Sequence, residues 1–149
     1  MSEGRIVLVD DEEMVTRNMD LLLRMETNYE VHCFNVPEEA LEHVHANPVD
    51  VVCSDFIMPG MNGLDLLAGV KQHQPTCSRL LLTGYADKES AVRAINEVGL
   101  FQYLEKPWDN EFVMITLRNA VERSQLLRQI EDKSSSIDSM REQVWKMLI

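Results

Sequence analysis

Residues 49–63 read VDVVCSDFIMPGMNG, an apolar run that ends in an aspartate and a turn. Val51 to Cys53 shows no polar alternation, which is typical of a strand covered on both faces in a parallel sheet. Asp55 follows, and turn-forming residues come after it: Pro59, Gly60, Asn62 and Gly63. The stretch therefore predicts a buried strand with a carboxylate at its carboxyl end.

Four more apolar runs flank this stretch and alternate with helical patterns. The runs are Ile6 to Val9, Val31 to Phe34, Leu80 to Leu82 and Tyr103 to Leu104. Apolar residues recur between them with helical spacing, for example at Leu64, Leu67 and Val70 and at Ala91, Ile95 and Val98. This repeated βα pattern predicts an α/β fold, a doubly wound (βα)5 parallel sheet with the flavodoxin-like strand order 2-1-3-4-5.

Polar residues stand directly after four of the five runs: Asp10 and Asp11, Asp55, Thr83, and Lys106. Ligands of open parallel sheets bind outside the carboxyl ends of the strands, so we expect these side chains in one crevice. The second run offers no comparable residue, as expected of an edge strand. Carboxylates favour Mg²⁺ over zinc, and one of them can act as a nucleophile toward phosphorus. A hydroxyl and an ammonium suit the phosphoryl oxygens.

Each of these residues also has a purely structural interpretation. Asp11, with the two glutamates after it, can simply favour a helix N-terminus. Asp55 can begin a turn, and Thr83 can end a strand as an ordinary β-branched residue. What favours the chemical interpretation is the joint occurrence of the set at strand ends.

Four motifs resemble, in order and spacing, those of the receiver (CheY-like) domain of bacterial two-component response regulators. They are VDDE at 9–12, SDFIMPGMNG at 54–63, LTGYA at 82–86 and YLEKPW at 103–108. The resemblance covers about residues 4 to 123. It implies a regulatory domain rather than an enzyme, one that catalyses only its own phosphorylation and slow dephosphorylation.

The resemblance implies a role for each site residue. Asp55 would accept a phosphoryl group from a phosphohistidine of a sensor histidine kinase or phosphotransfer protein. Mg²⁺ would be held by Asp11, Asp55 and the backbone carbonyl of Ile57, with Asp10 acting largely through water. Thr83 and Lys106 would bind the phosphoryl oxygens.

The resemblance also implies how the signal is displayed and how long it lasts. Tyr103 matches the aromatic switch position, and the family often has a cis bond before the proline that follows Lys106. Phosphorylation would switch the surface formed by the fourth helix, fifth strand and fifth helix. Ile57 and Tyr85 occupy the positions that tune hydrolysis, and because neither orients water well we expect a phosphoryl lifetime nearer hours than seconds.

The chain continues past the receiver, which we place at residues 1–123. Residues 124–149 show apolar spacing in steps of three and four, a coiled-coil pattern with two polar interruptions. Its members are Leu127, Ile130, Ser134, Ile137, Arg141, Val144 and Leu148. We expect a signalling helix that leads toward an output domain absent from this chain, and a homodimer through this helix, the switch surface, or both. A frayed linker, starting at the weak helix formers Ser134 to Ser136, is the alternative.

The sequence also indicates the type of output domain, the location of the protein and the role of its cysteines. The tail and the Lys-Pro-Trp motif resemble receivers of HD-GYP-type response regulators. The formal charge of -11 lies entirely in residues 1–123, which argues against direct contact with nucleic acid. The chain has no apolar stretch long enough to span a membrane and no signal pattern, so we expect a cytoplasmic protein. Its three cysteines lack zinc or disulfide spacing and are expected to be buried.

Three competing functions remain. A haloacid-dehalogenase-like phosphatase would also use Asp55, but it needs a second aspartate where Ile57 stands. A flavodoxin-like cofactor site needs a phosphate-cradling loop where this chain has Asp10 and Asp11. A degenerate receiver would signal by protein contact alone, against which the full set of site residues argues.

Overall fold

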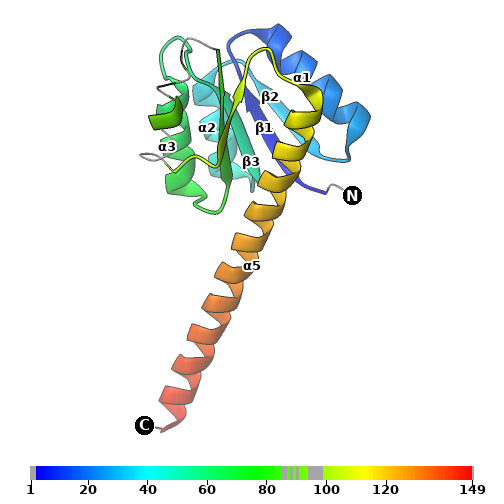
Figure 1. Cartoon of the computed structure of the whole chain (residues 1–149). Helices are drawn as coiled ribbons and strands as arrows, with labels where there is room; N and C mark the ends of the chain where they lie inside the picture. Colours follow the sequence, from blue (N-terminus) through cyan, green and yellow to red (C-terminus); the bar gives the residue numbers. More distant parts are fainter. Residues whose placement is uncertain (1–2, 85–86, 88, 90, 94–98, 149) are drawn as a thin grey trace.

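A five-stranded parallel sheet in the order β2-β1-β3-β4-β5 forms the centre of the fold, which confirms the predicted topology (Figure 1). The computed structural model describes residues 3–84, 87, 89, 91–93 and 99–148. The strands are β1 (Arg5–Val9), β2 (Glu30–Phe34), β3 (Val51–Asp55), β4 (Ser78–Thr83) and β5 (Gln102–Glu105). Every adjacent pair is parallel.

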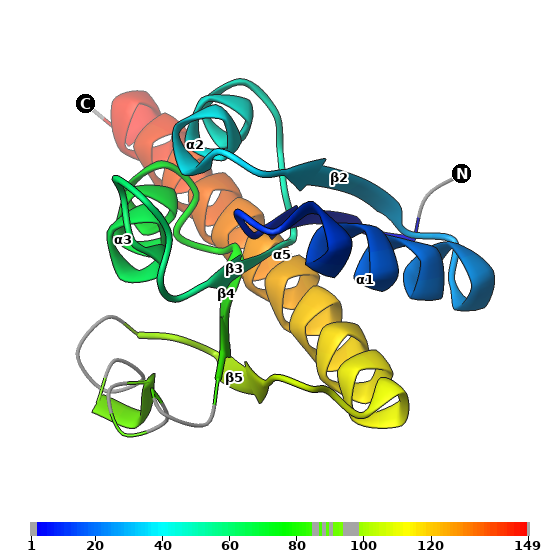
Figure 2. The same ribbon diagram turned by 90° about the horizontal axis from the view of Figure 1, so that it is seen from above.

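Helices cover both faces of the sheet. They are α1 (Glu13–Glu26), α2 (Pro37–Ala46), α3 (Gly63–His73) and α5 (Asn110–Leu148). One core lies between the sheet and α2 with α3, and a second between the sheet and α1 with α5, as Figure 2 shows. Residues 91–93 are also helical, whereas Ile95 and Val98 of the predicted fourth helix lie outside the described residues.

Burial follows strand position as the sequence predicts. All of β3 and β4 is buried, as is β1 after Arg5, because helices cover both faces of these central strands. Strand β2 lies at the edge and has no fully buried residue. For this reason the prediction for the cysteines is wrong at Cys33, which is exposed on β2, and correct at Cys53 and Cys77.

Helix α5 is the longest element, at 39 residues, and it is continuous through the three serines. It begins at the carboxyl edge of the sheet, crosses the second core, and projects from the opposite edge (Figure 1). A linker that frays at Ser134 is therefore not what the structure has. Within the described part of the chain, no helix combines the length and apolar character that crossing a membrane requires.

Candidate functional site

Three carboxylates meet at the carboxyl edge of the sheet. Asp10 and Asp11 follow β1, and Asp55 ends β3. One carboxylate oxygen from each residue can be chosen so that all three lie within 4.8 Å of one another, with Asp10 and Asp55 buried and Asp11 exposed. Sequence spacing predicted this cluster, and the parallel pairing of β1 with β3 brings it together.

Lys106 neutralises part of this negative charge. Its ammonium nitrogen lies 2.8 Å from an oxygen of Asp10 and 3.2 Å from one of Asp55. Lys106 also belongs to the sheet edge by its backbone, since its N–H donates to the carbonyl of Thr83 at 2.8 Å. The peptide bond between Lys106 and Pro107 is cis, as the resemblance implied.

The pKa values of the two central groups reflect this arrangement. Burial, with the nearby charge of Asp10, raises the pKa of Asp55 above its ordinary value, although Lys106 opposes the shift. Burial alone would lower the pKa of Lys106, but its hydrogen bond and charge interaction with Asp10, together with Asp55, outweigh burial and raise it. Lys106 therefore stays charged, and Asp55 is a stronger base than an exposed aspartate.

The position of Asp10 is fixed by groups that lie outside the acidic cluster. The backbone N–H of Glu12 donates to its carboxylate at 2.9 Å. The side-chain amide of Asn35 donates to the backbone carbonyl of Asp10 at 2.8 Å and lies 3.3 Å from the hydroxyl of Thr16. Asn35 is not among the site residues predicted from the sequence motifs. The available signal was its position directly after β2, at the same sheet edge as the predicted residues.

The loop after Asp55 is shaped by two glycines and an asparagine. Gly60 has a φ of +82°, a conformation that side chains with a Cβ rarely adopt. A Cβ atom at Gly63 would collide with the backbone carbonyl oxygen of Asp55. Asn62 caps α3, because its side-chain oxygen accepts a hydrogen bond from the backbone N–H of Asp65 at 2.9 Å. The turn residues thus bring the start of α3 tightly against the candidate nucleophile.

Thr83 lies at the same edge but directs its hydroxyl elsewhere. Its side chain is fully buried, and the hydroxyl donates to the carbonyl of Gly84 at 3.1 Å. Tyr103 on β5 is half buried against the core that α2 and α3 cover, and it lines a surface pocket of about 340 Å³ with Trp108 and Phe112. Ile57 is 61% exposed beside the site. Tyr85 lies outside the described residues.

Comparison with known protein families agrees with this geometry. Residues 6–122 match the model of the response regulator receiver domain. The chain belongs to this family. The receiver spans most of the chain and contains all the site residues described above.

Curated relatives of this receiver are regulatory proteins. The hydrogenase transcriptional regulatory protein HoxA of Cupriavidus necator is 34% identical over 121 residues, which cover 80% of this chain and 24% of that protein. The regulatory protein AtoC of Escherichia coli is 33% identical, covering 85% of this chain and 27% of that protein. The chain thus spans about a quarter of the length of these relatives.

Solved structures show the same fold. The signal receiver domain of an HD domain-containing protein from Pseudomonas fluorescens has a TM-score of 0.80 and 34% identity, covering 87% of this chain and 94% of that one. NtrX from Brucella abortus in complex with ADP also gives 0.80, with 27% identity over 89% of this chain and 30% of that one. The receiver is therefore homologous to regulators of the HoxA, NtrC and NtrX type.

Proposed function

We propose that this receiver accepts a phosphoryl group on Asp55 from the phosphohistidine of a sensor histidine kinase or phosphotransfer protein. The observation that carries the proposal is the group of three carboxylates around Asp55 with Lys106 at 3.2 Å. A carboxylate oxygen of Asp55 forms the new bond to phosphorus while the bond from phosphorus to the imidazole nitrogen breaks. The raised pKa of Asp55 makes the attacking oxygen more basic.

The acidic residues fit a hard divalent cation. We assign Asp10, Asp11, Asp55 and the backbone carbonyl of Ile57 to Mg²⁺, because oxygen ligands of this kind are those that it prefers. When bound, Mg²⁺ would supply positive charge next to the transferred phosphoryl oxygens. Lys106 supplies a second positive charge, already held in place by Asp10.

Phosphorylation would change the hydrogen bonding of Thr83 and Lys106. The new dianionic group adds strong acceptors beside Asp55. The Thr83 hydroxyl would leave the Gly84 carbonyl, to which it donates now, and turn to a phosphoryl oxygen. The half-buried Tyr103 would then move with its neighbours. The surface that changes combines the helix before β5, β5 itself and the start of α5.

We expect the phosphoryl group to last for hours rather than seconds. Ile57 and Tyr85 match in sequence the receiver positions that tune hydrolysis, and Ile57 has no polar group with which to orient an attacking water. The receiver accordingly acts as a regulator and not as a phosphatase that turns over substrate. Rapid loss of the adduct from purified protein in Mg²⁺ would contradict this expectation.

Residues 124–149 are proposed to connect the receiver, residues 1–123, to an output domain or partner. Their continuous helix and the share of the curated relatives that this chain spans support this role. The similarity to the receiver of an HD domain-containing protein supports an HD-GYP-type output, and the similarity to HoxA supports transcriptional regulation as the alternative. In neither case would this chain itself contact nucleic acid or membrane.

Intact-mass spectrometry tests the proposed phosphoacceptor. Incubation with a small phosphodonor and Mg²⁺ should add the mass of one phosphoryl group to the unmodified chain and none to Asp55→Asn. Chelating the Mg²⁺ should abolish the adduct. An adduct on Asp55→Asn, or no adduct on either protein, would refute the assignment.

Fluorescence of Trp108 gives an independent measurement of cation binding. Trp108 lies two residues from Lys106, and its indole N–H donates to Asn110 at 3.1 Å. The second tryptophan, Trp145, is exposed on α5 and is removed as Trp145→Phe. Mg²⁺ should change the remaining emission, and Asp55→Asn together with Asp11→Asn should abolish the change.

A further inference from the structure

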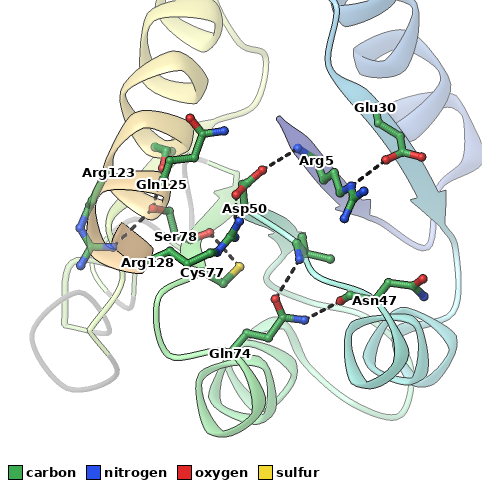
Figure 3. Close-up of polar contacts among 12 residues, drawn as sticks. Arg5, Glu30, Asn47, Asp50, Gln74, Cys77, Ser78, Arg123, Gln125 and Arg128 are labelled. Atoms are coloured by element: carbon green, nitrogen blue, oxygen red, sulfur yellow. Dashed lines mark hydrogen bonds and ion pairs between the residues drawn. The ribbon is translucent and has the colours of Figure 1, made fainter. Parts of the chain in front are cut away.

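Polar contacts fasten α5 to the sheet at the edge opposite the acidic site (Figure 3). The hydroxyl of Ser78, fully buried at the start of β4, donates to the carbonyl of Ala120 at 2.7 Å. The side-chain amide of Gln125 donates to the carbonyl of Glu3 at 2.9 Å. These bonds hold the last part of α5 that contacts the domain.

A further contact joins a buried carboxylate to an arginine of α5. Asp50, only 4% exposed, accepts the backbone N–H of Arg5 at 2.8 Å through one oxygen and Nη2 of Arg128 at 2.7 Å through the other. Its backbone N–H donates to the carbonyl of Arg5, and its carbonyl accepts the N–H of Ser78. Asp50 is thus fixed to β1 and β4, and it holds α5 through a single guanidinium.

Arg128 marks the point at which α5 leaves the receiver. Every described residue after it is exposed. By the rise of an α-helix, about 27 Å of α5 lies between Asn110 and Arg128, and about 30 Å lies between Arg128 and Leu148. The helix therefore has two arms of similar length on either side of this contact, and the first begins next to Lys106.

The two kinds of contact along the first arm restrain the helix differently. Val113, Leu117 and Val121 pack on the sheet through apolar contacts, which are not directional and permit small shifts. The Asp50–Arg128 pair is directional, as is the Ser78–Ala120 hydrogen bond, and separating the pair would leave the buried carboxylate without its charged partner. The buried hydroxyl of Ser124 has no hydrogen-bond partner among the described residues, so a shift of α5 that gives it an acceptor gains a bond.

We propose that Asp50 and Arg128 form a pivot that sets the direction in which α5 leaves the receiver. Movement of the helix start beside Lys106 is then carried to the far end of α5 as an opposite movement of similar size. The pivot is a property of the unmodified chain. Only the use of this movement as a signal rests on the phosphorylation proposed for Asp55.

Distance measurement between two spin labels tests the pivot on the full 149-residue chain. Cys33, the exposed cysteine, is replaced as Cys33→Ser, and labels are placed at Lys71→Cys on α3 and at the exposed Glu142→Cys on α5. Excess unlabelled protein removes distances between molecules. The parent should give one narrow distance distribution, and Arg128→Met should roughly double its width.

Controls separate the pivot from loss of charge and from unfolding. Arg141→Met removes the same charge from an exposed position of α5 and should leave the distribution unchanged. Arg128→Lys keeps the charge and should restore part of the narrowness. A thermal melt confirms that each variant is folded. Asp50→Asn retains an acceptor for the backbone N–H of Arg5 and should broaden the distance distribution as Arg128→Met does. Equal widths in the parent and in folded Arg128→Met would overturn the pivot.

In a second set of measurements, phosphodonor and Mg²⁺ are added and the phosphoryl adduct is followed by mass spectrometry in the same samples. The parent should shift its mean distance on phosphorylation, and Arg128→Met should be phosphorylated equally without a defined shift. An adduct without any shift in the parent would refute transmission through the pivot. Absence of the adduct would instead refute the phosphoacceptor proposal, while the comparison of unphosphorylated proteins would still decide the pivot.

Discussion

Lys106 balances two carboxylates that would otherwise repel each other in a buried place. Its single positive charge serves Asp10 at 2.8 Å and Asp55 at 3.2 Å, while Asp11 remains exposed to solvent. Negative charge therefore exceeds positive charge at the site by two. Such an arrangement is costly in the absence of a cation, because like charges close together disfavour ionisation. The acidic residues that the proposed function requires therefore destabilise the folded domain when no cation is bound.

Asp55→Asn should stabilise the domain at neutral pH in the absence of Mg²⁺. The folded state raises the pKa of Asp55, so it binds more protons than the unfolded chain between the two pKa values. Stability therefore falls as pH rises through that window, and the destabilisation is complete above the folded pKa. Removing the charge should raise the melting temperature, by roughly 2–8 °C for each kcal/mol gained in the free energy of unfolding of a domain of this size.

Thermal melts at several pH values check this prediction. The advantage of Asp55→Asn should shrink as the pH approaches the ordinary aspartate range, near 3.8. Mg²⁺ should stabilise the parent and leave the variant largely unaffected. Asp138→Asn removes one negative charge from the exposed part of α5 and should change neither melt. A variant less stable than the parent at pH 7 would contradict the electrostatic account.

Gly63→Ala should destabilise the domain, because the added Cβ would meet the backbone carbonyl oxygen of Asp55. Backbone cannot move aside as a flexible side chain can, so we expect a loss of about 1–3 kcal/mol. Urea denaturation measures it. Gly84→Ala is the matched control, since its Cβ would meet nothing within 4 Å. Equal losses in the two variants would show that the close approach is unimportant.

At the scale of elements, the sequence predicted those features that leave a local pattern: a polar residue at the end of a strand, or a regular spacing of apolar residues. The five strands, their order and the acidic cluster follow from apolar runs with polar residues after them. Asn35 was missed because its role is to hold a backbone carbonyl, and this leaves no pattern in the sequence. The pair of Asp50 and Arg128 was missed because 78 positions separate its members, and only the packing of α5 on the sheet brings them together.

The sequence predicts a helix through Ser134 to Ser136 although serine is a poor helix former, and α5 passes through them. Replacing all three by alanine should favour the helix by about 0.5 kcal/mol per residue. The sum, about 1.5 kcal/mol, corresponds to roughly tenfold in an equilibrium constant. Hydrogen exchange of the amides in residues 129–148 should therefore slow about tenfold. Replacement by glycine should speed it, and no response to either change would contradict this account from helix propensity.

At the scale of the whole molecule, α5 is the one described element that both begins beside the acidic site and extends beyond the domain (Figure 1). The C-terminal part of α5 carries large exposed apolar side chains: Leu126, Ile130, Ile137, Met140, Val144, Trp145, Met147 and Leu148. Ile130, Ile137 and Val144 belong to the seam inferred from sequence. They form one face with Leu126, Met140 and Met147, which take the place of Leu127, Ser134 and Arg141 of that seam. Leu127 is partly buried whereas Leu126 is exposed, and Ser134 and Arg141 are polar.

This face has the composition of a parallel two-stranded coiled coil. Ile130, Ile137 and Val144 repeat every seven residues, so β-branched side chains occupy one core position of the heptad. The other core position contains leucine or methionine, except for Lys133, and β-branched residues at the first with leucine at the second favour two parallel strands. A lysine in the core fixes register at a cost in stability. We therefore expect a homodimer whose two receivers lie at the same end.

Ile137→Glu should weaken this dimer at least tenfold, because it replaces a core side chain by a carboxylate that the pairing would bury. Loss of a buried isoleucine alone costs about 2 kcal/mol or more, and 1.4 kcal/mol corresponds to a factor of ten. Ser139→Glu adds the same charge about half a turn away, on the opposite face of the helix, and should leave the dimer intact. Sedimentation equilibrium over a range of concentrations measures both variants. An unmodified chain that stays monomeric throughout, or equal weakening by the two substitutions, would show that this face does not pair with its own copy.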